Sequence, residues 1–141
     1  MWQTEHSTQT TATPEAVWTV WSDVERWPEW NGDLERAEIS GPFDAGSTIT
    51  MHPRVGDAIE LRLADVSKPV RFTDEADLGQ VIVRTVHEIR PDDGDGSRIV
   101  YRMEIRGPAA DTIGAQVGPE ITADFPDVLA ALAERAERAE R

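Results

Sequence analysis

The segment TPEAVWTVWSDVERWPEW, residues 13–30, contains the strongest local signals in the chain. Thr13 is a residue type that caps helices, and Pro14 suits the first helical position, where its missing N–H leaves no bond unmade. We predict a helix from Pro14 to about Ser22, one further helical turn before Pro28, and a bend after it. The apolar residues of this segment recur at helical spacing: Val17, Trp18, Val20, Trp21 and Val24.

Strand patterns lie on both sides of this segment. Apolar and polar residues alternate in several of them, which is typical of strands with one buried face. Leu78-Gly79 has the form of a two-residue hairpin turn, and turn-forming residues fill the loop Asp92–Ser97. Strands joined by such short connections pair antiparallel. The predicted strands are Trp2–Thr11, Leu34–Ser40, Ser47–His52, Asp57–Val66, Val70–Asp77, Gln80–Arg90 and Arg98–Arg106.

Helical spacing returns after Gly107-Pro108 and predicts a long C-terminal helix. We expect this helix to be kinked, because Gly118-Pro119 and Pro126 interrupt it and an interior proline costs about 3 kcal/mol. Gly114 and Gly118 lie one turn apart, so they either let the helix approach the sheet closely or widen the mouth of a cavity. The apolar row that we expect to face the sheet contains Ile113, Val117 and Ile121.

Length and composition limit the classes of protein that the chain can form. Its 141 residues predict one domain, residues 1–141, and a 39% share of hydrophobic residues is normal for a globular protein. The formal net charge of −13 disfavours nucleic acids and anionic membranes as partners, because phosphates attract basic surfaces. The absence of cysteine excludes disulfides and thiol catalysis.

The sequence favours a cytoplasmic protein that works without a cofactor. It shows neither a basic segment followed by an apolar run at the N-terminus nor an apolar window long enough to span a membrane. His6, His52 and His87 fall on different predicted elements and lack metal-ligand spacing. We therefore predict no metal, no cofactor, no nucleic-acid partner and no membrane insertion, and the oligomeric state stays open.

Three motifs, TPEAVW at 13–18, WSD at 21–23 and WPEW at 27–30, stand out within this order of elements. Together they resemble the START-like, Bet v 1-like (SRPBCC) superfamily, and most closely its bacterial polyketide cyclase/dehydrase-like group. The resemblance covers nearly the whole chain. Further matching positions are Gly46, Phe72, Asp74, His87, Gly94, Gly96 and Gly107-Pro108.

The resemblance implies an α+β helix-grip fold, in which a curved antiparallel sheet of about six to seven strands wraps around a long C-terminal helix. A short helical segment stands between the first two strands. The superfamily includes cyclases, lipid carriers, hormone receptors and chaperone activators, so the fold alone does not define a function.

Strand parity predicts which side chains face the helix. The loop Asp92–Ser97 places His87 opposite Tyr101, and a turn at Leu78-Gly79 places Asp74 opposite Val83. Both hairpins then put the more apolar set of residues on one face. The residues that we predict to line a cavity are Phe72, Asp74, Val83, Thr85, His87, Tyr101, Met103, Ile105, Ile113, Val117 and Ile121.

Three polar side chains on this face are candidates for chemistry. His87 is either a core residue hydrogen-bonded to a neighbour such as Tyr101, a ligand contact, or a proton donor and acceptor. Asp74 either faces the cavity, where burial would raise its pKa, or turns to solvent or to an ionic partner. The predicted pairing separates Asp74 from His87 by about 13 Å, which argues against a catalytic pair.

Three functions agree with these observations. The first is binding of a small hydrophobic molecule, such as a lipid, a polyketide or an aromatic metabolite, in a cavity between sheet and helix. The second is a cyclase or dehydratase in which His87, Tyr101 or Asp74 moves protons. The third is a protein-interaction role like that of chaperone activators. The tryptophans of segment 13–30 form either part of the core or an aromatic cage, and their helical spacing favours the core.

Overall fold

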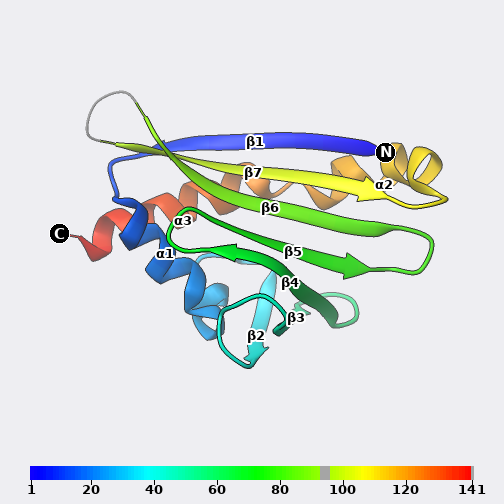
Figure 1. Cartoon of the computed structure of the whole chain (residues 1–141), viewed down its shortest axis with the longest axis horizontal. Helices are drawn as coiled ribbons and strands as arrows, with labels where there is room; N and C mark the ends of the chain where they lie inside the picture. The colour runs from blue at the N-terminus through cyan, green and yellow to red at the C-terminus, as the bar shows by residue number, and fades with distance from the viewer. Residues whose placement is uncertain (93–95, 141) are drawn as a thin grey trace.

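The computed structural model describes residues 1–92 and 96–140, and Figure 1 shows its arrangement. Residues 93–95 of the predicted loop lie outside the described residues. All neighbouring strands of the sheet are antiparallel, and the first strand in sequence pairs with the last. In the described part of the chain seven strands form the sheet in the order β1-β7-β6-β5-β4-β3-β2: β1 Trp2–Thr10, β2 Leu34–Ser40, β3 Thr48–Pro53, β4 Ile59–Ser67, β5 Arg71–Asp77, β6 Ile82–Pro91 and β7 Ser97–Arg106.

Two helical segments connect β1 to β2. Helix α1 spans Pro14–Ser22, as predicted, and the Thr13 side chain accepts a hydrogen bond from the backbone N–H of Ala16. The 3-10 helix η1 then spans Val24–Glu29 and includes Pro28. The predicted helical turn before Pro28 is therefore present, and the helix ends at Glu29, one residue after Pro28.

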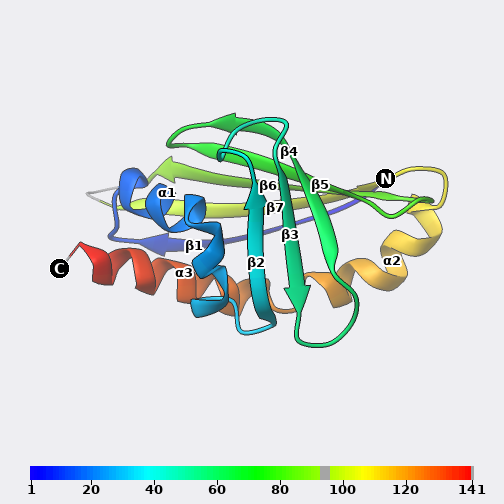
Figure 2. The same cartoon turned by 90° about the horizontal axis from the view of Figure 1, so that it is seen from below.

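The C-terminal region forms two helices, where we predicted one long kinked helix. Helix α2 spans Ala110–Ile121 and helix α3 spans Phe125–Ala139. Pro119 lies inside α2, whereas Pro126 lies in the first turn of α3, where a proline suits a helix start. The chain thus breaks between the helices, and Figure 2 shows both helices below the concave side of the curved sheet.

Helix α2 packs against β1 through its two buried glycines. A Cβ atom added at Gly118 would lie 2.5 Å from the Trp2 ring, and one at Gly114 would lie 2.5 Å from the Trp2 Cβ. Of the two roles that the sequence left open for Gly114 and Gly118, the structure therefore shows close approach to the sheet.

Helix α3 is attached to the start of the chain at its C-terminal end. The hydroxyl of Thr10 donates to Glu137 Oε2 at 2.6 Å, and the Thr13 N–H and hydroxyl donate to Glu140 at 2.9 and 3.0 Å. Arg135 forms an ion pair with Glu29 of η1. These contacts hold the end of α3 that lies away from α2.

The register of the β5–β6 hairpin differs from the prediction by two residues. The Leu78 N–H donates to the Val81 carbonyl at 2.9 Å, which places Gly79-Gln80 at the centre of the turn. Phe72 therefore pairs with His87, and Asp74 pairs with Thr85 rather than with Val83. Because side chains alternate with a period of two, this shift keeps every side chain on its predicted face.

The β6–β7 hairpin has the predicted register, with His87 opposite Tyr101. The four tryptophans of segment 13–30 are all buried in the core.

None of the helices in the described residues has the length and apolar character of a membrane span. Together, the curved sheet, the helical segment after β1 and the C-terminal helices form the predicted helix-grip fold.

Candidate functional site

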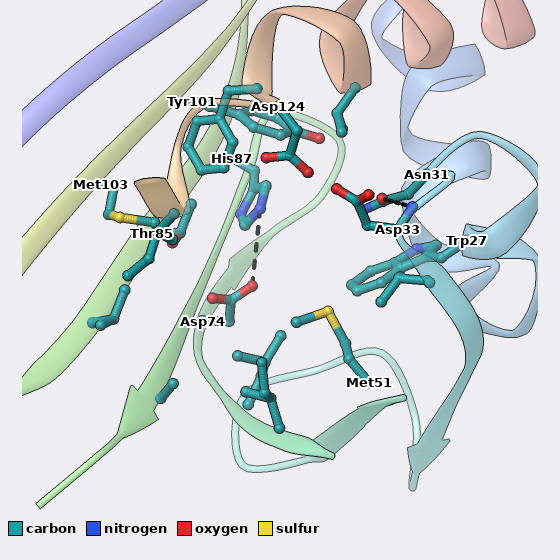
Figure 3. A pocket seen from close by; sticks show the side chains of 18 of the residues that line it. Trp27, Asn31, Asp33, Met51, Asp74, Thr85, His87, Tyr101, Met103 and Asp124 are labelled. Atoms are coloured by element: carbon teal, nitrogen blue, oxygen red, sulfur yellow. Dashed lines mark hydrogen bonds and ion pairs between the residues drawn. The ribbon is translucent and has the colours of Figure 1, made fainter. Parts of the chain in front are cut away.

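A cavity of about 330 Å³ lies between the concave face of the sheet, the η1–β2 connection and the junction of α2 with α3 (Figure 3). Most of its wall is apolar or aromatic, and a few polar groups are set into that wall. The residues that line it are Trp27, Trp30, Asn31, Asp33, Leu34, Met51, Pro53, Ile59, Leu61, Phe72, Asp74, Ala76, Leu78, Val83, Thr85, His87, Tyr101, Met103, Ile121, Asp124, Phe125 and Val128.

The structure brings most of the predicted lining residues together around this cavity. Ile105, Ile113 and Val117 are the exceptions and do not line it. Ile105 is fully buried at the end of β7, opposite Trp2. Ile113 and Val117 pack at the edge of the core, because α2 covers the β1 edge of the sheet while the helix break lies beside the cavity. The predicted residues in the lining are Phe72, Asp74, Val83, Thr85, His87, Tyr101, Met103 and Ile121.

Sequence reasoning missed two parts of the wall. Met51 on β3 and Leu61 on β4 lie on the face of the sheet that lines the cavity. The alternation of side chains along a strand could have identified both. Asp33 and Asp124 lie in connections between elements, where no periodic pattern indicates the direction of a side chain. Trp27 and Trp30 were assigned to the core, and they are both buried and part of the lining.

Asp74 is a buried carboxyl group that opens toward the cavity. It lies in β5, only 5% of its surface is exposed, and no described residue donates a hydrogen bond to its side chain. Its Oδ2 is 3.8 Å from His87 Nε2, beyond hydrogen-bond distance (Figure 3). Burial, with a smaller contribution from the charge of Glu75, raises the pKa of Asp74 to about 7. Both protonation states are therefore accessible near neutral pH.

The predicted distance between Asp74 and His87 was wrong, and the hairpin register explains the error. With Asp74 opposite Thr85 and Phe72 opposite His87, the two side chains are diagonal neighbours on adjacent strands. Diagonal neighbours on one face lie within reach of long side chains. The sequence-based separation of about 13 Å followed from a turn placed one residue too early.

His87 is held by β5 and by aromatic rings. Its Nδ1 lies 3.3 Å from the Phe72 carbonyl, and its ring stacks on that of Phe72 at a centroid distance of 4.0 Å. A carbonyl only accepts, so Nδ1 carries the proton and the Nε2 lone pair points at Asp74. Burial lowers the pKa of His87 to about 3, so the imidazole is neutral at pH 7.

Tyr101 has a different partner from the one we expected. Its hydroxyl oxygen accepts a hydrogen bond from Trp21 Nε1 at 3.1 Å, and its ring meets that of His87 edge-on at 4.6 Å. Since the hydroxyl accepts from Trp21, its own proton remains to be donated within the cavity. Burial raises the pKa of Tyr101, which keeps the hydroxyl protonated.

Two further acidic groups, Asp33 and Asp124, lie across the cavity from Asp74. In Figure 3 the carboxyl groups of Asp33 and Asp124 point toward one another from the η1–β2 connection and the α2–α3 junction. Partial burial raises the pKa of Asp124 to about 6, and a hydrogen bond with Asp33 adds to the shift. The neighbouring carboxyl group of Asp33 thus favours the protonated form of Asp124.

No group of three or more His, Cys, Asp or Glu side chains in residues 1–92 and 96–140 is arranged to hold a metal ion. His52 lies on the outside of the protein, where its Nε2 is 2.7 Å from Glu38 Oε1. The site is therefore described by its shape, its aromatic wall and its carboxyl groups.

A curved sheet closed by C-terminal helices over a mostly apolar cavity defines the class of helix-grip proteins. Within it, the chain belongs to the family described as polyketide cyclase / dehydrase and lipid transport, whose model matches residues 1–137. A search of curated proteins found no match to the sequence.

Solved structures with this fold include a synthase and a START superfamily protein. A norcoclaurine synthase point mutant from Thalictrum flavum, in complex with a transition-state analogue, has a TM-score of 0.77 at 17% identity and covers 99% of this chain and 96% of its own. The protein XoxI from Bacillus cereus has a TM-score of 0.77 at 14% identity, with 100% and 99% coverage. A START superfamily protein from Mycobacterium smegmatis has a TM-score of 0.74 at 15% identity and covers 97% of this chain and 98% of its own. At these identities the likeness establishes the fold.

Proposed function

We propose that this protein binds a small molecule with an apolar body in the cavity between the sheet and the α2–α3 junction. The observation that carries the proposal is the cavity itself, about 330 Å³ in volume and lined mainly by apolar and aromatic side chains. Concave sites of this volume with a few polar groups are the usual form of small-molecule sites. The family description, which includes lipid transport, agrees with this function.

The cavity volume sets the size of the ligand. A water molecule occupies about 30 Å³ in the liquid, so the cavity holds roughly ten non-hydrogen atoms at liquid density. That is the size of one aromatic ring with a short side chain. A ligand of this size fits wholly inside, whereas a long acyl chain would extend through the mouth.

A substitution that fills the cavity tests this function. Ala76 is buried, belongs to the lining and has the smallest side chain there. Ala76→Phe should weaken binding of 4-phenyl-1-butanol, measured by calorimetry, by at least about tenfold. The control is Ala130→Phe, which adds the same ring at an exposed position of α3 and should leave affinity unchanged. Equal affinity in both variants would contradict binding in this cavity.

A second function, proton transfer on a bound carbonyl compound, is favoured by one observation. Asp74 and His87 face the cavity together, and Asp74 changes protonation state near neutral pH. An ionised Asp74 would remove a proton from the carbon next to a carbonyl, while the Tyr101 hydroxyl donates to the carbonyl oxygen. This is the step that a cyclase or dehydratase requires.

Deuterium exchange distinguishes this second function from binding alone. In D₂O, proton NMR should show faster exchange of the protons beside the carbonyl of 4-phenyl-2-butanone with the wild-type protein than without it. Asp74→Asn should abolish the acceleration while the ketone still binds. An exchange rate that is the same with and without protein would leave binding as the function and contradict catalysis of this step.

A further inference from the structure

The side chains of the cavity wall that carry a charge near neutral pH are carboxyl groups, because His87 is neutral there. Asp33, Asp74 and Asp124 line the cavity, and among the described residues no lysine or arginine does. Arg54, in the β3–β4 connection, does not belong to the lining, and its Nε donates to the Gly32 carbonyl at 2.8 Å. The interior therefore repels anions and offers no cation to balance its own carboxyl groups.

Asp74 also lacks the hydrogen-bond donors that a buried carboxyl group normally has. Within the described part of the chain, no donor lies within hydrogen-bond distance of its side chain, and the neutral His87 presents a lone pair to it. A buried carboxylate without donors costs several kcal/mol. Because the group opens into the cavity, a bound ligand is the component that can supply the missing donor.

We propose that the natural ligand of this cavity is an amine, whose apolar or aromatic body occupies the wall and whose ammonium group binds among Asp74, Asp33 and Asp124. This inference rests on the proposed binding function and names the chemical class of its ligand. An ammonium group supplies the hydrogen-bond donor that Asp74 lacks and a positive charge that no described lysine or arginine brings to the wall.

The aromatic part of the wall suits the same ligand. Trp27 and Tyr101 lie in the wall around the same space as the acidic groups (Figure 3), and Phe125 also belongs to the lining. Aromatic rings attract cations through their negative faces and pack against an apolar body. Fatty acids, acidic polyketides and phosphorylated compounds are disfavoured, because their anionic groups would be buried beside carboxyl groups.

Three probes that share one body and differ in charge test the proposal. They are 4-phenylbutylamine, 4-phenyl-1-butanol and 4-phenylbutyrate, each titrated into the wild-type protein by calorimetry at pH 7.5. We expect the amine to bind at least about tenfold more tightly than the alcohol, since a charge-assisted hydrogen bond contributes about 1.5–3 kcal/mol. The carboxylate should bind most weakly.

The outcomes separate the two proposals. If the alcohol binds as tightly as the amine, or the carboxylate binds most tightly, the amine inference is wrong while the binding function stands. If none of the three binds, both are wrong. This comparison needs only the wild-type protein, so it does not depend on how any variant folds.

Variants locate the ammonium group. Asp74→Asn and Asp124→Asn should each weaken amine binding by about tenfold and change alcohol binding by less than about twofold. The matched control is Glu120→Gln, which removes an exposed negative charge near the end of α2 without altering the lining. It should leave amine affinity unchanged. An equal loss in Glu120→Gln would assign the effect to the overall net charge and contradict an amine site in the cavity.

Discussion

Asp74 Oδ2 lies 3.8 Å from His87 Nε2, although the two residues are 13 positions apart in sequence. They are not directly paired in the β5–β6 hairpin, where Asp74 lies opposite Thr85 and His87 lies opposite Phe72. The imidazole is neutral and directs a lone pair at the carboxyl group, so a proton on Asp74 relieves the repulsion between two acceptors. The two groups together hold one titratable proton near neutral pH.

The stability of the protein should depend on pH through two opposing contributions. Between about pH 4 and 7, folded Asp74 keeps a proton that the unfolded chain has lost, so its contribution falls as the pH rises. Between about pH 3 and 6.5, unfolded His87 binds a proton that the folded protein does not, so its contribution rises with pH. Each slope is about 1.4 kcal/mol per pH unit, and they largely cancel between about pH 4 and 6.5.

Asp74→Asn removes one of these contributions. The free energy of unfolding of the variant minus that of the wild type should increase by about 1–4 kcal/mol between pH 4 and 7.5, measured with urea at each pH. Asp57→Asn, at an exposed position of the β3–β4 connection, is the control and should show a difference that does not change with pH. A flat difference for Asp74→Asn would mean that this carboxyl group ionises normally in the folded protein.

The protonation state of His87 can be observed directly. Nitrogen-15 NMR should show a neutral ring with the proton on Nδ1 from pH 8 down to about pH 4, because the pKa of His87 is lowered by burial. Protonation of the ring between pH 6 and 7 would contradict the buried position and the hydrogen bond to the Phe72 carbonyl.

Removing the Tyr101 hydroxyl should leave Trp21 without its acceptor. The Trp21 Nε1–H bond to Tyr101 is buried, so Tyr101→Phe should lower the free energy of unfolding by about 1–3 kcal/mol. In the NMR spectrum, the Trp21 indole N–H should shift and exchange faster. The Trp27 indole N–H, which donates to the Trp21 carbonyl at 2.8 Å, serves as the internal reference and should keep its protection.

Gly118→Ala should destabilise the protein, although alanine is the better helix former. The added Cβ would lie 2.5 Å from the Trp2 ring, and such overpacking costs about 1–3 kcal/mol. In the Trp2→Ala background the same substitution should become neutral or stabilising, because the ring is gone. Ala115→Gly, at an exposed position of α2, is the control and should cost up to about 1 kcal/mol in both backgrounds. Additive effects of Gly118→Ala and Trp2→Ala would exclude the contact.

The fold was predictable because its signals are local and repeat along the chain. Thr13-Pro14 marks a helix start, and the alternation of apolar and polar residues shows that each strand has one buried face. Both predictions remain correct when the position of a turn is wrong by a residue. The loop 92–97 gave the β6–β7 register correctly because turn-forming residues fill it completely. The β1–β7 pairing joins the first and the last strand of the chain, and no local pattern indicates it.

The chemistry of the site was less predictable, because it depends on distances that one residue of turn placement changes. The predicted face of the sheet for Asp74 was correct, because a shift of two residues in strand pairing leaves each side chain on the same face. The predicted distance between Asp74 and His87 was wrong. Asp33 and Asp124 lie in irregular connections, and only the folded chain brings them together. The break between α2 and α3 also placed Val117 away from the cavity.

The attachment of α3 at one end has a consequence for the timescales of motion. Glu137 and Glu140 bond to Thr10 and Thr13 at the C-terminal end, whereas residues 122–124, beside the cavity, join two separate helices. Along α3, amide hydrogens should therefore exchange with solvent faster near its first turn than near Ala136. The cavity lies beside this first turn, so one helix should show two levels of protection, lower at the wall of the cavity and higher where it is bonded to the start of the chain.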